Sequence, residues 1–467
     1  MKRSVARSRR EFLKTAALIG AAIGSPSLIP RHVLGQNGKP GANDTVKVAI
    51  IGLGGRGTSI YPDEVKAAAG VKVVGVCDFW PTRLKRFMRQ FEGDFTSEQG
   101  YTDFRKLIEK EKPDGVMAET TTHQRAWVSA IAMQMGAHLY IEKPMCLTIK
   151  EGRYLVNAAR KFNRVTQVGT QLRSLPLGQW VQQQIQAGVI GKIKVVEAPN
   201  FVGPNRWTDQ PGGAYPEGMT DEIWDIWTNQ AVLRPYHTKL HANWTNWWDY
   251  DGGGRSFGVS GWGTHSYDQV NMILGTSETG PVEIVLDEPT EIREAARFDY
   301  ATAITNEDGE ETYRALKLSG PRAKMRMWFA DGVELRLNLD GTRGPGLGCI
   351  VVGEKGKIEI NRHKITSNPK EVAAALPEES KNKRPETVYH VENWIDCIKT
   401  GKKCNADIEY GQRSTTLCEL VNIVRASAPI GERIGWDPVN ERFINNDKGN
   451  EMLARPRRKG YELPELT

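Results

Sequence analysis

Val48-Ala-Ile-Ile-Gly-Leu-Gly-Gly-Arg-Gly57 is a short apolar segment that runs directly into a glycine-rich turn. Its glycines follow the pattern Gly52-x-Gly54-x-x-Gly57. The first glycine of such a pattern permits a tight turn, the second lets a pyrophosphate approach the backbone, and the third lets the next helix pack close to the strand. Because Gly55 and Arg56 belong to the same turn, we expect both beside the phosphates of a dinucleotide.

A second apolar run, Val71-Lys-Val-Val-Gly-Val-Cys77, ends in Asp78, 21 positions after Gly57. A carboxylate at this point can accept hydrogen bonds from the ribose hydroxyls of NAD. It would also repel the 2′-phosphate of NADP, and Phe79 rather than an arginine follows it. We therefore expect NAD, while Arg56 near the pyrophosphate keeps NADP open as the alternative.

Strand and helix patterns alternate along the first part of the chain and give way to β-rich runs after residue 170. Alternation of this kind predicts a parallel, doubly wound sheet. Later runs such as Ala323-Lys-Met-Arg-Met-Trp-Phe329 alternate in polarity, which is typical of half-exposed antiparallel strands. The predicted fold is therefore α/β, with an N-terminal Rossmann sheet and a C-terminal α+β domain that holds a large, mainly antiparallel open sheet.

The same patterns divide the chain into four segments. We expect a signal peptide at 1–35, a turn-rich linker at 36–45, a Rossmann domain at 46–165 and a C-terminal domain for substrate and oligomer contacts at 166–467. Helical patterns near 386–426 are expected to pack back on the Rossmann domain.

The first residues contain Ser8-Arg-Arg-Glu-Phe-Leu-Lys14, followed by a mildly apolar run over 15–29. Paired arginines before such a run predict a signal for twin-arginine export. A basic tail or an amphipathic anchor is the alternative. The export machinery is then a partner, and the expected location is the periplasm or another extracytoplasmic compartment. Since that route carries folded proteins, a dinucleotide would have to be loaded before export and held tightly.

The charge and composition exclude several classes of protein. Residues 1–35 hold seven lysines and arginines and one acidic residue, a net +6, so about +1 of the chain's +7 remains for residues 36–467. We therefore expect no nucleic-acid partner. No run of about 18 apolar residues predicts a transmembrane segment. The six cysteines lack zinc-site spacing, so we expect no metal and mostly free thiols, with a Cys397–Cys404 disulfide as the alternative.

Glu142-Lys-Pro144 follows another apolar run, Gly136-Ala-His-Leu-Tyr-Ile141. Together with the glycine turn, this motif resembles the Gfo/Idh/MocA family, and Thr166-Gln-Val-Gly-Thr-Gln-Leu-Arg-Ser174 and Gly353-Glu-Lys-Gly356 are similar to segments of its secreted bacterial members. The resemblance implies a Rossmann domain, a C-terminal domain whose open sheet often forms a homo-oligomer, and NAD or NADP used on sugars, polyols or related compounds.

The resemblance also implies roles for particular residues. Thr120, Thr121 and His123 match the loop that passes the cofactor, and Glu142 and Lys143 match the motif beside the nicotinamide. The expected substrate site has Arg173 behind it, and His265 and Asp268 on the helix that carries the family's acid/base histidine.

Lys143 and His265 are the predicted catalytic residues. A lysine ammonium can hydrogen-bond a hydroxyl and stabilise developing negative charge, and a histidine can take the proton near neutral pH. Family members usually have an aspartate four residues before the histidine, but this chain has Gly261. Tyr267 or Tyr236 is a possible substitute in the proton relay, and a different chemistry is the other alternative.

Seven of the 13 tryptophans fall between Trp207 and Trp262. Sugar rings present apolar faces that stack on aromatic rings. We therefore expect one or two of these aromatic residues to contact a sugar, with Tyr236 and Trp248 as the named candidates and core packing as the role of the others.

These observations lead to one function and two alternatives. The first is an exported NAD(P)-dependent oxidoreductase that transfers hydride between a tightly bound nicotinamide cofactor and a carbohydrate or polyol. The second is an NAD-dependent enzyme that cleaves glycosides through transient sugar oxidation, and the third is a non-catalytic sugar-binding protein on the same fold.

Overall fold

The computed structural model describes residues 45–254, 257–305, 311–340 and 347–466. The predicted signal peptide and all of the linker but Thr45 lie outside these ranges. The two halves described below belong to one structural unit, Val46–Thr467.

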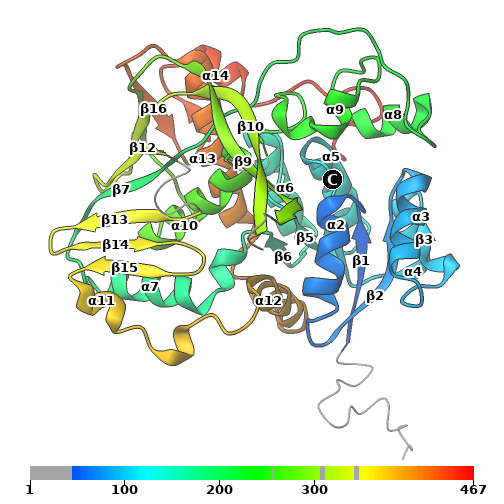
Figure 1. Ribbon diagram of the computed structural model, residues 1–467, viewed down its shortest axis with the longest axis horizontal. Coiled ribbons are helices and arrows are strands. Elements are labelled where there is room, and N and C mark those ends of the chain that lie inside the picture. Colours follow the sequence, from blue (N-terminus) through cyan, green and yellow to red (C-terminus); the bar gives the residue numbers. More distant parts are fainter. Residues whose placement is uncertain (1–44, 255–256, 306–310, 341–346, 467) are drawn as a thin grey trace, which may run out of the picture. The chain divides into compact units, whose positions relative to one another are not determined.

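The N-terminal half is built on a parallel sheet of six strands in the order β3-β2-β1-β4-β5-β6. The order reverses between β1 and β4, and in open α/β sheets ligands bind in the crevice at this point. The predicted Rossmann sheet is confirmed (Figure 1). The strands are β1 (Val46–Ile51), β2 (Val71–Cys77), β3 (Gly100–Tyr101), β4 (Gly115–Ala118), β5 (His138–Ile141) and β6 (Thr166–Val168).

Helices connect these strands and cover the sheet. Because helices bury both faces of a parallel sheet, its strands are nearly continuous in apolar residues, and every residue of β4 is buried. The first helix is short and continues as a π-helix, Tyr61–Val65. The helices are α2 (Gly55–Ile60), α3 (Pro81–Gln90), α4 (Phe104–Glu111), α5 (Thr122–Gln134) and α6 (Ile149–Lys161).

The C-terminal half contains a nine-stranded sheet in the order β15-β14-β13-β7-β12-β11-β8-β16-β17. Only the pairing of β12 with β7 is parallel among the described strand pairs of this sheet, so the predicted, mainly antiparallel sheet is confirmed. The strands are β7 (Ile193–Asn200), β8 (Glu283–Leu286), β11 (Met325–Trp328), β12 (Glu334–Asp340), β13 (Cys349–Gly353), β14 (Lys357–Ile360), β15 (Ile365–Asn368), β16 (Arg433–Asp437) and β17 (Arg442–Phe443).

The main core of this half lies between the sheet and the helices that pack on it. Val196 and Leu337 of the sheet share a cluster with Trp180, Val270 and Leu420 of the helices. A separate hairpin is formed by β9 (Glu291–Thr305) and β10 (Glu311–Arg322). The helices are α7 (Pro176–Gln186), α8 (Asp221–Thr228), α9 (Thr238–Ala242), α10 (Thr264–Leu274), α11 (Lys370–Ala374), α12 (Glu386–Thr400), α13 (Ile408–Ser427) and α14 (Asp447–Glu451).

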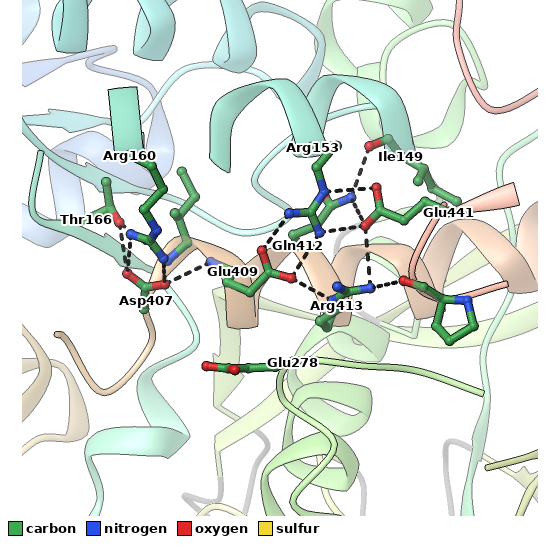
Figure 2. Close-up of polar contacts among 12 residues, drawn as sticks. Ile149, Arg153, Arg160, Thr166, Glu278, Asp407, Glu409, Gln412, Arg413 and Glu441 are labelled. Carbon is green, nitrogen blue, oxygen red and sulfur yellow. Dashed lines mark hydrogen bonds and ion pairs between the residues drawn. The ribbon is translucent and has the colours of Figure 1, made fainter. Parts of the chain in front are cut away.

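Two C-terminal helices pack on the Rossmann half. Trp394 of α12 is fully buried and contacts Tyr140 of β5, with the ring centroids 5.7 Å apart. Helix α13 crosses α6 through a group of ion pairs, which Figure 2 shows. Arg153 of α6 contacts Glu409 at 2.7 Å and Glu441 at 2.8 Å, and Arg413 contacts Glu409 at 2.7 Å. These contacts join α13 and the segment around Glu441 to α6 of the Rossmann half.

No helix of the described residues is both long and apolar enough to cross a membrane. Within the same residues, no group of three or more His, Cys, Asp or Glu side chains is arranged to hold a metal ion. All six cysteines are buried and free.

Candidate active site

A cavity of about 1160 Å³ lies at the carboxyl ends of the Rossmann strands and extends under the C-terminal half. One part of its wall is the glycine turn, the end of β2, the loop after β4 and the Glu142–Pro144 segment. The other part comes from α8 and the segments that follow it, from the start of α10, and from Leu347, Arg362 and Thr387. The cavity therefore joins the switch point of the sheet to the region expected to hold the substrate.

The glycine turn has the shape of a phosphate cradle. Gly52 has a φ of +97°, which favours glycine, and a Cβ at Gly57 would lie 1.9 Å from the carbonyl oxygen of Gly52. A Cβ at Gly54 would meet no atom within 4 Å, so this side of the turn is open. Gly52, Gly54 and Gly55 line the cavity, and Gly57 lies behind them, where the helix approaches the strand.

Asp78 lies at the end of β2 and lines the cavity, as the sequence predicts. Its carboxylate accepts hydrogen bonds from the backbone N–H of Leu53 at 2.9 Å and of Trp80 at 3.0 Å. Burial raises the pKa of this carboxyl, and Arg83, 3.7 Å away, opposes that rise. The side chain is thus held in place at the cavity wall. Arg83 also lines the cavity and places a basic group beside Asp78.

Arg56 lines the cavity, but its guanidinium is bound to two carboxylates. Its Nε contacts Glu142 at 2.7 Å, and its terminal nitrogens contact Glu64 at 2.5 and 2.9 Å. Burial of Glu142 raises the pKa of its carboxyl, yet Arg56, Lys143 and Arg125 together hold that pKa below the ordinary value. Arg56 therefore lies in the cavity wall as part of an ion-pair group, rather than as a free cation.

Glu119 was not predicted from the sequence, although it follows β4 directly. Its side chain is buried, it lines the cavity, and neither of its carboxyl oxygens has a hydrogen-bond partner among the described residues. Burial and the nearby Glu142 raise the pKa of this carboxyl well above its ordinary value. The two carboxyls therefore differ, because Arg56 holds the pKa of Glu142 below its ordinary value while burial and the charge of Glu142 raise that of Glu119.

The loop after β4 places only part of its predicted set at the cavity. Thr120 and Thr121 line it, whereas His123 does not. The His123 Nε2 lies 2.7 Å from the carbonyl oxygen of Trp227, and its ring packs against Trp227 and Tyr250. Burial lowers the pKa of His123 to about 3. This histidine is a neutral residue of the aromatic core behind the cavity.

Lys143 lies in the cavity wall and is half-buried. Its Nζ donates a hydrogen bond to the carbonyl oxygen of Gly261 at 3.2 Å. Burial lowers the pKa of Lys143, while Glu142 and Asp251 act to raise it. The peptide bond between Lys143 and Pro144 is cis, and Arg125 of α5 donates a hydrogen bond to the Pro144 carbonyl, so this turn is fixed to the neighbouring helix.

His265 lies at the start of α10 and faces the same cavity as Lys143. Burial lowers the pKa of His265 well below its usual value, and the positive charges of Arg362 and Lys143 act in the same direction. The ring is therefore neutral, and its buried Nδ1 has no hydrogen-bond partner among the described residues. A neutral imidazole beside a lysine can accept a proton from a bound hydroxyl.

Arg173 and Asp268, two predicted substrate residues, do not line the cavity. Both are buried, and the Arg173 Nε lies 2.8 Å from each carboxylate oxygen of Asp268. Ser414 of α13 donates a further hydrogen bond to Asp268 at 2.6 Å. The pair joins the segment after β6 to α10 and α13, so its geometry is that of a structural ion pair behind the site.

Tyr236 and Trp248 also lie away from the cavity wall. Tyr236 packs in an aromatic cluster with Trp224, and Trp248 is held between Arg206 and Arg455. Other rings from the tryptophan-rich region line the cavity instead, namely Trp227, Trp244 and Trp262, together with Trp127 of α5 and His241.

Several cavity residues carry no motif that identifies them in a single sequence. Asp251, Ser260, Thr122, Arg125 and Arg362 line the wall, but they come from segments far apart in the chain. For Asp251 a signal was present, because it opens the run Asp251-Gly-Gly-Gly254 shortly before the His265 segment.

Comparison with known proteins gives the family. Residues 46–170 match the model of the oxidoreductase family with an NAD-binding Rossmann fold, Gfo/Idh/MocA. Residues 179–314 and 316–463 match the C-terminal alpha/beta domain of that oxidoreductase family. The chain therefore belongs to the Gfo/Idh/MocA oxidoreductase family and carries its NAD-binding Rossmann fold.

Individual relatives are more distant. The chain is 22% identical over 272 residues to glycosyl hydrolase family 109 protein 2 of Akkermansia muciniphila, an alignment that covers 51% of this chain and 54% of the relative. The matches to curated relatives span between 26% and 54% of those proteins' lengths.

Solved structures with the same fold include two sugar-related enzymes. Aldose-aldose oxidoreductase from Caulobacter crescentus, complexed with glycerol, is 15% identical with a TM-score of 0.55, over 84% of this chain and 99% of that one. The WlbA dehydrogenase from Bordetella pertussis, in complex with NADH and UDP-GlcNAcA, is 18% identical with a TM-score of 0.53, over 84% and 99%. At these identities, the likeness establishes the fold.

Proposed function

We propose that the chain is an exported NAD-dependent oxidoreductase that oxidises or reduces a CH–OH group of a carbohydrate or polyol. The observation that carries this proposal is the placement of Lys143 and His265 in the same cavity as the glycine turn and Asp78. One cavity thus joins a dinucleotide cradle to a cation and a neutral base, the two groups that alcohol oxidation requires.

The residues of the cavity fit NAD. The open face at Gly54 suits a pyrophosphate, Asp78 suits the ribose hydroxyls, and the carboxyl of Glu119, which has no partner among the described residues, suits a polar group of the nucleotide. When bound, NAD supplies the hydride acceptor or donor for the reaction. NADP stays the alternative, now with Arg83 as well as Arg56 near the nucleotide end of the cavity.

In this proposal Lys143 and His265 have different roles toward the substrate, charge stabilisation and proton transfer. The Lys143 ammonium binds the reacting oxygen and stabilises negative charge on it, while its remaining hydrogen bond to Gly261 fixes the amine. The neutral His265 takes the hydroxyl proton as the carbonyl forms, and returns it when the reaction runs toward the alcohol. Burial keeps water from competing at both groups.

The aromatic wall supports a sugar as the substrate class. Trp227, Trp244 and Trp262 line the cavity, and aromatic rings suit the apolar faces of pyranoses. The structures of similar fold include an aldose-aldose oxidoreductase and a dehydrogenase crystallised with a sugar nucleotide. A cofactor that does not exchange outside the cytoplasm favours a closed cycle, in which one sugar is oxidised and another is reduced.

A second candidate is glycoside cleavage through transient oxidation of the sugar. Two observations favour it: the curated relative from Akkermansia muciniphila is a glycosyl hydrolase family 109 protein, and Gly261 removes the carboxylate of an ordinary proton relay. Such an enzyme needs the same NAD and the same lysine, but yields no net NADH. A non-catalytic sugar-binding protein would need neither.

The experiment that separates these functions uses the natively purified protein with its retained nucleotide. A panel of aldoses and polyols is tested for reduction of the bound NAD, and aryl glycosides are tested for release of phenol. We expect bound NAD to be reduced by at least one aldose or polyol in the wild-type protein and not in Lys143→Ala. Phenol release that depends on Lys143 would favour the second candidate, and neither reaction in nucleotide-loaded protein would refute both enzymatic functions.

Export and assembly are part of the proposal. The paired residues Arg9 and Arg10 support twin-arginine export, and the half-exposed strands β13 to β15 support a homo-oligomer formed through the open sheet. Changing both arginines to lysine should leave the protein in the cytoplasm with its leader attached. Normal yield outside the cytoplasm would contradict twin-arginine export.

A further inference from the structure

Lys143 has an unusual partner for a catalytic amine, because its Nζ is hydrogen-bonded to a backbone carbonyl, that of Gly261. Among the described residues, no carboxylate lies within ion-pair distance of this Nζ. Glu142, the neighbour in sequence, accepts hydrogen bonds from Arg56 and from the Lys143 backbone instead. A carboxylate elsewhere in the cavity would therefore add to the charge that Glu142 supplies to this ammonium.

Asp251 occupies the required region. It is 2% exposed and lines the same cavity as Lys143 and His265. Its Oδ2 accepts a hydrogen bond from the Thr122 hydroxyl at 2.7 Å, and its Oδ1 accepts from the Gly253 N–H at 3.0 Å and from the Ser260 hydroxyl. Burial raises the pKa of the Asp251 carboxyl, and the three donors together with the charge of Arg125 oppose that rise, so the hydrogen bonds favour the ionised form.

The hydrogen bonds also place this carboxylate beside the segment that Lys143 contacts. Ser260, which is bound to Asp251, directly precedes Gly261, whose carbonyl accepts the Lys143 hydrogen bond. Thr122, which supplies the other hydroxyl, is the first residue of α5 and follows the loop after β4. Asp251 is therefore fixed from both halves of the protein, at the junction where the substrate site meets the nucleotide site.

The charges around Lys143 give Asp251 a specific effect. Glu142 and Asp251 raise the pKa of the amine, whereas burial, Arg125 and Arg56 lower it. The charge of Glu142 is already shared with Arg56 at 2.7 Å. Asp251 accepts its hydrogen bonds from neutral groups and, among the described residues, forms no ion pair, so no cation is bound directly to it.

We propose that Asp251 is the acidic partner of Lys143 in this site and holds the lysine as an ammonium, in place of the carboxylate that Gly261 cannot supply. It is a positioning residue, since it acts on the substrate through Lys143. The inference builds on the proposed function, because the ammonium is the group that would bind the reacting oxygen. The Asp251-Gly-Gly-Gly254 loop thus belongs to the active site.

The test measures the protonation of Lys143 without any substrate. Full-length protein is acetylated with acetic anhydride across a range of pH, and modification of Lys143 is quantified by peptide mass spectrometry. Only the neutral amine reacts, so Asp251→Asn should move the Lys143 profile to lower pH and raise its acetylation rate at pH 7 about tenfold, which corresponds to a fall of about one unit in the pKa of the amine. Asp251→Glu, which keeps the charge, should stay near wild type.

Asp249→Asn is the matched control. Asp249 lies two residues away in the same segment, but it pairs with Arg234 at 2.8 Å and does not line the cavity. If Asp251→Asn does not fold, Asp251→Ser carries the same expectation, because its hydroxyl can exchange hydrogen bonds with Ser260 and Thr122. Unchanged Lys143 reactivity in a folded neutral variant, or an equal change in Asp249→Asn, would overturn the proposal. Since no turnover is measured, this result is independent of whether the proposed reaction is found.

Discussion

Asp268→Ala should destabilise the protein without changing the residues that line the cavity. The substitution removes the carboxylate that lies 2.8 Å from the Arg173 Nε and accepts a 2.6 Å hydrogen bond from Ser414. It leaves Arg173, whose side chain is only 4% exposed, buried without its counter-charge. Breaking a buried ion pair by removing one partner costs about 3–5 kcal/mol. We expect a loss of that size in the free energy of unfolding.

Urea unfolding of the nucleotide-free protein measures this loss. Two comparison variants test whether the loss comes from leaving Arg173 buried without its counter-charge. Asp287→Ala breaks a partly exposed surface pair with Arg326 and should cost about 0–1 kcal/mol. The double variant Arg173→Met with Asp268→Leu should recover most of the stability, because apolar residues of similar volume often replace a buried pair at no cost. Wild-type stability in Asp268→Ala, combined with loss of sugar binding, would refute the structural role and restore the substrate role expected from the sequence.

Three further predictions concern the cavity. Asp78→Ala should lower the preference for NAD over NADP in nucleotide titrations; an unchanged preference would show that the ribose is held elsewhere. Glu119→Gln should remove one source of pH dependence in the free energy of unfolding. The pKa of Glu119 is raised in the folded state, so its contribution to stability is fully present below the ordinary glutamate pKa. Above that pKa the contribution falls by about 1.4 kcal/mol per pH unit, as long as the carboxyl is ionised in the unfolded chain and protonated in the folded one. The variant should show a flatter profile of unfolding free energy against pH than the wild type. Parallel profiles for the two proteins would contradict a raised pKa of Glu119. Gly261→Asp should raise turnover with free NAD and a polyol in a net dehydrogenase, mainly above the histidine pKa, whereas no gain would favour transient oxidation.

Much of the Rossmann half and its nucleotide site could be predicted from the sequence, because the signals are local. A strand, three glycines and a following helix are consecutive in the chain, and backbone sterics at Gly52 and Gly57 leave few other arrangements. Asp78 follows a buried strand in the same way. Lys143 belongs to a short motif at the end of β5, so its place at the carboxyl edge of the sheet also follows from the sequence order.

The substrate side could not be predicted in this way, because its contacts join distant segments. Which tryptophan rings face the cavity depends on how the segments around α8 and α9 pack, and no local pattern shows that Trp227 lines it and Trp248, the predicted residue, does not. His123 shows the same limit, since its neighbours in sequence line the cavity while its own ring turns into the aromatic core. Asp251 reaches Thr122 across 129 positions of sequence, a contact that no local pattern encodes.

The most direct test of the central claim is the nucleotide content of the protein purified after native export. The account predicts NAD, released by denaturation in about equimolar amount, and its absence from Gly54→Val with the C-terminal half still folded, because a side chain at Gly54 would project into the open face of the cradle. A protein that carries no nucleotide and binds none on titration, or a Gly54→Val variant that retains equimolar NAD, would contradict the assignment of this cavity as the site of an NAD-dependent reaction.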